Sequence, residues 1–215
     1  MKTRILLAGS MVCAIAMNLT TGIAQAKEDV FEALPAGIDA YVYGYPLVTM
    51  EMTRRVMSNV EKPEGTRAPM GQFVRMREYP SAAFRDVTAP NADTLYTTAW
   101  IDVGQEPWVL SLPDMHDRYY LFPMLDGWTD VFQVPGKRTT GTGPQTYAIT
   151  GPGWKGQAPD GMKQISSPNN SVLVIGRILV YSDNDLPTAS NLAKQIELTP
   201  LSQWLVSGSQ GIPAK

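Results

Sequence analysis

The chain has one cysteine and one histidine among its 215 residues, and this scarcity excludes several kinds of site. Cys13 lies in an apolar N-terminal run. The rest of the chain can therefore form no disulfide, thiolate nucleophile or cysteine-ligated zinc site. His116 is then the sole residue through which a Ser-His-Asp triad or a nitrogen-ligated metal site could be built. We expect neither a metal nor another cofactor.

An excess of positive charge and a second long apolar run are also missing. Lys and Arg number 18 against 20 Asp and Glu, and no basic patch is interleaved with aromatic residues, so nucleic acid is not an expected partner. After residue 26 no stretch of about 18 apolar residues occurs, so we expect a soluble mature protein without a membrane span.

The first 26 residues have the three parts of a signal peptide. Lys2 and Arg4 give a positive start, and an apolar run of about 13 residues follows, shorter than the ~20 needed to cross a bilayer. Residues 24–26, Ala-Gln-Ala, form a small-x-small cleavage site. The alternative is a buried N-terminal helix. We predict cleavage after Ala26 and a periplasmic or secreted protein that begins at Lys27.

Residues 27–69 are predicted to form an N-terminal helical segment followed by a loop. Apolar residues recur at spacings of three or four, which builds one stripe along a helix. Pro46 lies in the middle of this pattern and predicts a kink or two shorter helices. The stripe consists of Ile38, Tyr41, Tyr45, Val48, Met52 and Val56.

Residues 70–201 alternate short branched and aromatic runs with Gly, Pro, Asp and Asn clusters. The gaps are too short for helices between parallel strands, so we predict a mainly β fold, an all-β sandwich. A short C-terminal helix between Asp183 and Ile196 and a flexible tail over residues 202–215 complete the prediction. The expected strands are Thr94–Ile101, Trp108–Leu112, Arg118–Met124, Val131–Val134, Thr146–Thr150 and Val172–Tyr181.

Few side chains in this pattern suggest chemistry. His116 lies in a polar turn, typical of an exposed residue. The pairs Asp126 with Asp130 and Asp114 with Asp117 could serve glycoside hydrolysis, or could bond their own backbone in turns. The glycine-rich segment 136–143 lacks the spacing of a phosphate-binding loop. The many Tyr and Trp residues suit either a sugar or aromatic ligand or the core of a sandwich.

Six segments, in order, resemble the bacterial domain-of-unknown-function 1254 family. The resemblance implies an immunoglobulin-like β-sandwich with a helical N-terminal part, and it implies no established activity. It also implies a second β domain, which a chain that ends soon after Leu201 is expected to lack. The segments are Ala40–Val48, Pro90–Tyr96, Arg118–Tyr120 with Leu125–Asp126, Arg138–Gly143, Gly151–Gly156 and Ile175–Arg177.

The polar residues on which the resemblance falls are our candidates for a ligand site. The alternative is a buried structural network, in which Arg118 pairs with Asp126. The favoured function is a binding or accessory module for a small molecule or glycan. Alternatives are a hydrolase that uses Asp93 and Asp126, and a structural half-protein that pairs with a separately encoded second domain. The candidate residues are Asn91, Asp93, Tyr96, Arg118, Tyr120, Asp126, Arg138 and Arg177.

Overall fold

A computed structural model describes residues 31, 33–86 and 91–207. The predicted signal peptide, residues 1–26, lies outside the described residues. The chain divides into two compact units, Met1–Pro46 and Leu47–Lys215.

Residues 33–58 are helical without a break in the assignment, across both Gly44 and Pro46. The alternative of two shorter helices was therefore wrong, although the boundary between the two units falls directly after Pro46. A proline removes one helical hydrogen bond, and the helix can continue on either side of it. Within the first unit the rings of Tyr41 and Tyr45 lie one helical turn apart, with centroids separated by 5.5 Å.

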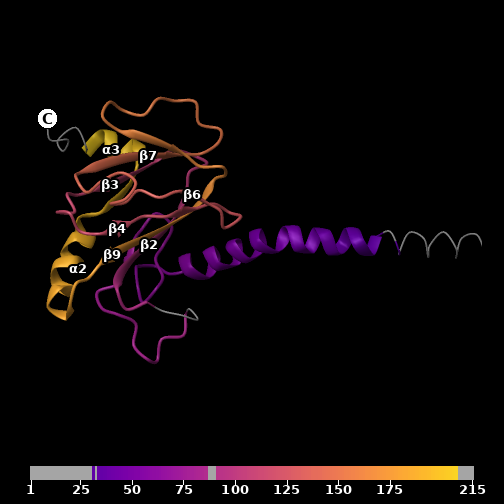
Figure 1. Ribbon diagram of the computed structural model, residues 1–215. Coiled ribbons are helices and arrows are strands. Elements are labelled where there is room, and N and C mark those ends of the chain that lie inside the picture. The colour runs from indigo at the N-terminus through magenta and orange to yellow at the C-terminus, as the bar shows by residue number, and fades with distance from the viewer. Residues whose placement is uncertain (1–30, 32, 87–90, 208–215) are drawn as a thin grey trace, which may run out of the picture. The chain divides into compact units, whose positions relative to one another are not determined.

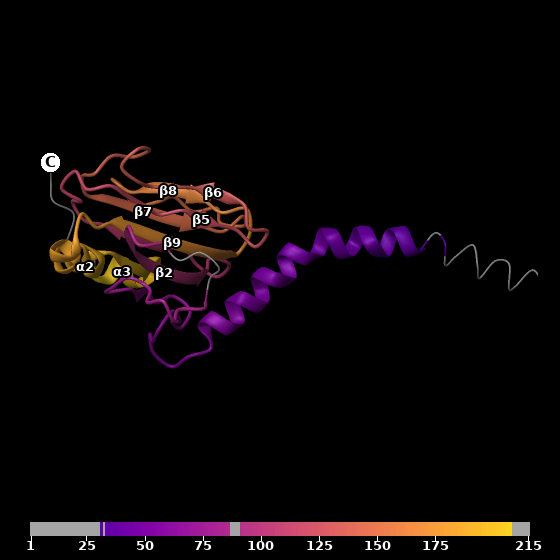
Figure 2. The same cartoon turned by 60° about the horizontal axis from the view of Figure 1, so that its bottom comes forward.

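The second unit is a mainly β sandwich of two sheets, as predicted, and Figures 1 and 2 show the sheets as two layers. The larger sheet has the strand order β1-β2-β9-β5-β6, with β4 also paired to β9, and the smaller sheet has the order β10-β3-β7-β8. The strands are β1 (Val74–Arg75), β2 (Thr94–Asp102), β3 (Trp108–Leu112), β4 (Tyr120–Leu121), β5 (Met124–Leu125), β6 (Val131–Gln133), β7 (Gln145–Thr150), β8 (Lys163–Ser166), β9 (Ser171–Leu179) and β10 (Glu197–Pro200).

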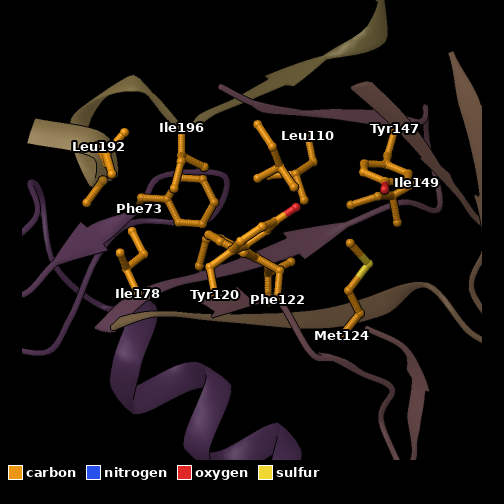
Figure 3. Packing of buried hydrophobic residues seen from close by; sticks show 14 of the residues in the cluster. Phe73, Leu110, Tyr120, Phe122, Met124, Tyr147, Ile149, Ile178, Leu192 and Ile196 are labelled. Carbon is orange, nitrogen blue, oxygen red and sulfur yellow. The ribbon is translucent and has the colours of Figure 1, made fainter. Parts of the chain in front are cut away.

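The core lies between the two sheets and is filled by alternate residues of each long strand. In β2 the buried positions Leu95, Ala99 and Ile101 face this core, and in β7 Tyr147 and Ile149 do so. Figure 3 shows aromatic and aliphatic side chains of both layers pointing toward one another. Runs of branched and aromatic residues bounded by turn residues are the reason why β2, β7 and β9 could be predicted to within two residues at each end.

One predicted strand, Arg118–Met124, is two short strands, β4 and β5. Pro123 lies between them and has no backbone N–H to donate to the ladder. The carbonyl of Pro123 still accepts from Ile175 N at 2.9 Å, so the strand bends without leaving β9. The edge strands β1, β8 and β10 were not predicted, because each contains only one β-branched residue and no aromatic one.

The C-terminal part contains two helices where one was predicted. A 3₁₀ turn, η1 (Asp183–Asp185), leads into α2 (Leu186–Gln195), which contacts β1, β2 and β9. After β10 comes α3 (Leu201–Ser207), so the flexible tail predicted from residue 202 was wrong for residues 202–207. Residues 208–215 lie outside the described part of the chain.

Candidate ligand-binding site

The outer face of the larger sheet carries a row of polar and apolar side chains from its two longest strands. β2 and β9 pair antiparallel along their whole length, with Tyr96 opposite Arg177 and Thr98 opposite Ile175. Because side chains alternate between the faces of a strand, these four residues lie on the face opposite the sandwich core. Val74 of β1 lies opposite Thr98 from the other side and extends the row.

A cavity of about 830 Å³ lies over this face. Its floor is the row just described, and one wall is the helical segment that begins at Leu47, through Val48, Met52 and Val56. These three side chains are between 52% and 62% exposed, although the stripe pattern is typical of a buried helix face. The remaining lining comes from residues between Thr66 and Asp86. The volume falls in the range of small-molecule sites.

The helical wall is held against the sheet by a small apolar cluster of its own. Met50 packs with Trp100 of β2 and Leu173 of β9, and Met57 lies against the same cluster. The carbonyl of Met57 also accepts from Ala68 N at 3.1 Å, which ties the end of the helix to the following loop. The cavity therefore lies beside a packed contact that fixes the distance between its helical wall and its floor.

Arg177 is the charged residue in the floor of the cavity. Its guanidinium carbon lies 5.1 Å from the centroid of the Tyr96 ring, a cation–π distance. Its Nε is buried and has no hydrogen-bond partner among the described residues. A buried donor without an acceptor is costly, so this nitrogen marks a place where a ligand acceptor would be favoured.

The other charged residues of the cavity belong to its rim. Arg67, Glu78 and Asp86 are all exposed. Asp86 already accepts a hydrogen bond from the Thr66 hydroxyl at 2.6 Å. The rim carries both signs of charge, whereas the floor carries a single cation. The arrangement can therefore hold an apolar body near the floor together with one acceptor group.

Two of the eight predicted site residues, Tyr96 and Arg177, meet in this cavity. Asn91 does not line it. Its Oδ1 instead accepts from the backbone N–H groups of Asp93 and Thr94, both at 3.0 Å, and so shapes the turn before β2. Asp93 is exposed, and its carbonyl accepts from Val180 N at 2.9 Å.

Tyr120 and Asp126 are structural residues. Tyr120 is fully buried in the sandwich core and donates to the carbonyl of Gly141 at 2.7 Å. Asp126 is 4% exposed, and its Oδ1 accepts from the backbone N–H groups of Trp128 and Asp130. Its Oδ2 accepts from Asn169 Nδ2 at 3.2 Å. These bonds close the loop after β5, as the turn alternative for this aspartate expected.

Arg118 is buried, and its partner is Asp185 rather than the predicted Asp126. Two guanidinium nitrogens donate to the Asp185 carboxylate at 2.5 and 2.8 Å, and one also donates to the carbonyl of Leu179 at 2.7 Å. The guanidinium also lies 4.8 Å from the Tyr181 ring. The predicted structural network therefore exists, but with an acid that lies 67 positions away in the chain.

Arg138 is exposed and lies apart from the cavity. Its guanidinium carbon is 5.1 Å from the centroid of the Tyr119 ring, the same stacking distance that Arg177 keeps to Tyr96. The two arginines thus share a ring contact and differ in burial and in position. Arg138 is a useful control for Arg177 because of this difference.

The carboxylate pair proposed for a hydrolase does not assemble. Asp93 lies beside Val180 at one end of β9, whereas Leu125, directly before Asp126, pairs with Leu173 near the other end. Seven residues of strand separate these positions, which corresponds to roughly 20 Å at ~3.3 Å per residue. Even glycoside hydrolysis, which tolerates a wide separation, keeps its two carboxylates within about 10 Å of each other. On this geometry Asp93 and Asp126 lie too far apart to act together on one bond.

His116 lies on an exposed turn, as predicted. Its backbone φ is 50°, that of Asp117 is 60°, and the side chain of His116 is 75% exposed. Its nearest acid is Asp114, with Nδ1 and Oδ1 separated by 3.5 Å. The ring borders a second, smaller cavity of about 310 Å³ that Arg118 and Tyr181 also line. Within the described residues, no three His, Asp, Glu or Cys side chains are placed to hold a metal ion.

Replacing His116 by alanine should change folding and ligand binding little, because the imidazole is 75% exposed and Asp114, which lies 3.5 Å from it, is itself 49% exposed and so does not hold the ring in an enclosed site. The checks are the midpoint of urea unfolding and the ligand response of the variant in the assay described below. A loss of any detected activity by more than about a hundredfold, with folding intact, would instead identify His116 as a general acid or base.

The sequence contains a signal for the cavity that our prediction did not use. Along β2 the outward residues Thr94, Tyr96, Thr98 and Trp100 are half apolar and large, and Ile175 stands at the same face of β9. A sheet face that is open to water usually carries charged and small polar residues. An outer face of this composition indicates a covering element, and the part of the apolar stripe that lies within the second unit, Val48, Met52 and Val56, supplies one.

The residues 70–200 match the model of a family described as "Protein of unknown function (DUF1254)". The match covers more than half of the chain. The chain belongs to the DUF1254 family. The resemblance stated from the sequence is thereby confirmed, and the match covers every strand of the sandwich, including the strands β2 and β9 that form the floor of the cavity.

Among solved structures, this DUF1254 chain is similar to the crystal structure of the VPA0106 protein from Vibrio parahaemolyticus, with 25% identity and a TM-score of 0.63. That match covers 82% of this chain and 39% of the other, so the chain spans less than half of that protein's length. An uncharacterised protein from Burkholderia cenocepacia matches at 14% identity and a TM-score of 0.39, over 83% of this chain and 44% of that one. The curated proteins gave no match.

Proposed function

We propose that this DUF1254 chain is an exported binding module whose ligand is a small molecule held in the cavity on the outer face of the larger sheet. The observation that carries the proposal is the cavity itself, with an apolar helical wall and, in its floor, a buried donor, Arg177 Nε, that has no partner among the described residues. Apolar walls with a few placed polar groups are the usual composition of small-molecule sites.

The lining favours a small molecule over a glycan. A glycan presents many hydroxyl groups, which need polar partners and flat aromatic platforms. Here the rings are Tyr96, already stacked under Arg177, and Phe84, and much of the remaining lining is aliphatic or Met. A largely apolar molecule loses fewer hydrogen bonds to water on entering such a site.

A thermal-shift screen with a variant that fills the cavity tests the proposal. Thr98→Phe places a ring in the floor and suits a strand, so it should fold. A ligand present at about a hundred times its Kd stabilises the wild type by about 2.7 kcal/mol, which corresponds to a rise in Tm of roughly 5–10 °C. Thr98→Phe should lose this rise.

Thr146→Phe is the matched control. Thr146 is also half-buried in a central strand, β7, but belongs to the smaller sheet and does not line the cavity. We expect the control to keep the ligand response. A response that survives in Thr98→Phe, or a broad screen without any response in the wild type, would contradict the proposed site.

Export is the second part of the proposal, and the signal-peptide pattern of residues 1–26 supports it. We predict that mature protein recovered from a periplasmic extract begins with Lys27-Glu28-Asp29. N-terminal sequencing or intact-mass analysis measures this directly. A protein that keeps Met1 and is found in the cytoplasm alone would contradict it. Within the described residues, no helix is long and apolar enough to span a membrane.

A further inference from the structure

The floor of the cavity offers one cation and no competing charge. Arg177 stacks on Tyr96, its Nε is buried, and none of its nitrogens forms a hydrogen bond or ion pair with a described residue. An arginine keeps its charge at every pH at which the protein is folded. Its charge is therefore compensated by no acid of the described chain, and a bound molecule could supply the missing acceptor.

The shape of the donor decides the kind of acceptor. A guanidinium is planar and presents its N–H groups in a fork that matches the two oxygens of a carboxylate. A phosphate would need further donors, and the strand floor has few to give. The backbone of β2 is paired with β9 through nine successive residue pairs, so its N–H groups are largely used within the sheet.

The rest of the lining decides the body of the molecule. Ile175 is the neighbour of Arg177 on the same face of β9, and it lies opposite Thr98 of β2. Val74 of β1 lies on the other side of Thr98, so two aliphatic side chains flank this part of the floor. The carboxylates of the cavity, Glu78 and Asp86, are exposed at its rim. Acids close to the floor would repel a bound anion. Glu78 and Asp86 are exposed to water, which screens their charge, so they repel an anion at the floor only weakly.

We propose that the cavity binds a monocarboxylate with an apolar body, whose carboxylate accepts hydrogen bonds from Arg177 and whose body lies between the strand floor and the helical wall. This inference rests on the proposed function, because it assigns the chemistry of the ligand within the same cavity. It concerns the class of ligand only, as an aliphatic or aromatic acid would fit the same donors.

The test compares acids with their neutral amides. Octanoate and octanamide, and cinnamate and cinnamamide, are titrated into the full mature protein by calorimetry at neutral pH. Each acid should bind at least about tenfold more tightly than its amide, because a charge-assisted bidentate pair is replaced by a weaker contact. Arg177→Met should reduce the affinity for the acid to that for the amide, and Arg177→Lys should lie between them.

Arg138→Met is the control with the same change of charge. It removes an arginine that also stacks on a tyrosine ring but lies outside the cavity, so the preference for acids should persist. The comparison of acid with amide in the wild type does not depend on any variant. It therefore decides the question even where Arg177→Met fails to fold.

The outcomes separate the two proposals. Equal binding of acids and amides, abolished by Thr98→Phe, would overturn the carboxylate assignment and leave the cavity as the ligand site. The carboxylate assignment would likewise fail, and the cavity would remain the ligand site, if the acids do not bind but other compounds stabilise the wild type and not Thr98→Phe. If no compound binds the cavity, both the carboxylate assignment and the proposed function fail.

Discussion

Replacing Arg118 by alanine should lower the free energy of unfolding by about 3 kcal/mol, the lower end of the range for a fully buried ion pair, because the Asp185 carboxylate is not fully buried and keeps its hydrogen bond from Tyr181 N. The Arg118 side chain is 8% exposed and that of Asp185 is 16% exposed, so both partners are largely shielded from water in the wild type, although Arg118 borders the smaller cavity. The carbonyl of Leu179 would lose a donor as well. The measurement is urea unfolding at an unchanged m-value.

Arg138→Ala is the control for this prediction. Arg138 is exposed and makes a ring contact, so its removal should cost less than about 0.5 kcal/mol. The double variant Arg118→Met with Asp185→Leu should be less destabilised than Arg118→Ala, because it leaves no charge unpaired. An Arg118→Ala protein as stable as the wild type would show that this pair contributes no stability.

The same pair predicts a dependence of stability on pH. The hydrogen bonds from Arg118 hold the pKa of Asp185 below its usual range. A carboxyl group with a lowered pKa in the folded state stabilises the fold above its unfolded pKa, near 4, and this contribution is lost as the pH falls through the folded value. Below about pH 4 the wild type should therefore lose stability more steeply than Asp185→Asn.

Particular residues show how far the sequence alone could lead. The strands β2, β3, β7 and β9 were predicted because each is a short run rich in branched and aromatic residues between Gly, Pro, Asp and Asn clusters, and this signal is local. The partner of Arg118 was not predicted, because Asp185 lies in the turn before α2, and only the folded chain brings the two residues together. A bidentate pair requires a particular distance and orientation between the guanidinium and the carboxylate, and these cannot be read from the sequence.

The candidate site divides in the same way. Tyr96 and Arg177 were chosen because the family resemblance falls on polar residues, and their antiparallel register makes them neighbours on one face. Asn91, Tyr120 and Asp126 were chosen on the same ground, but they satisfy backbone groups and close turns. A polar residue of a ligand site and one of a structural network look alike in a sequence. They differ in whether the folded chain already supplies a hydrogen-bond partner, and only the structure shows that.

Gly176 belongs to the Ile175–Arg177 segment of the resemblance, and the structure shows why a glycine is needed there. The two residues lie on opposite faces of β9, so that Arg177 points to the cavity and Gly176 to the sandwich core. A Cβ built on Gly176 would lie 2.4 Å from Cε1 and 2.5 Å from Cζ of the Phe122 ring. Phe122 is fully buried, so its ring has little room to move aside.

Gly176→Ala should therefore destabilise the protein by about 1–3 kcal/mol, the usual cost of overpacking. Phe122→Ala should cost about 3–5 kcal/mol, because it removes a buried ring and leaves a cavity. The two effects should not add. In the Phe122→Ala background the clash is gone and the new methyl group fills part of the cavity, so Gly176→Ala should be neutral or stabilising there.

A double-mutant cycle measures this coupling, which we expect to be about 1–3 kcal/mol in favour of the double variant. Gly143→Ala is the control, because a Cβ at Gly143 meets nothing within 4 Å and should change stability little in either background. Additive effects of Gly176→Ala and Phe122→Ala would mean that the ring yields to the methyl group. In that case the close packing of Phe122 against β9 would not explain why position 176, next to Arg177, is a glycine.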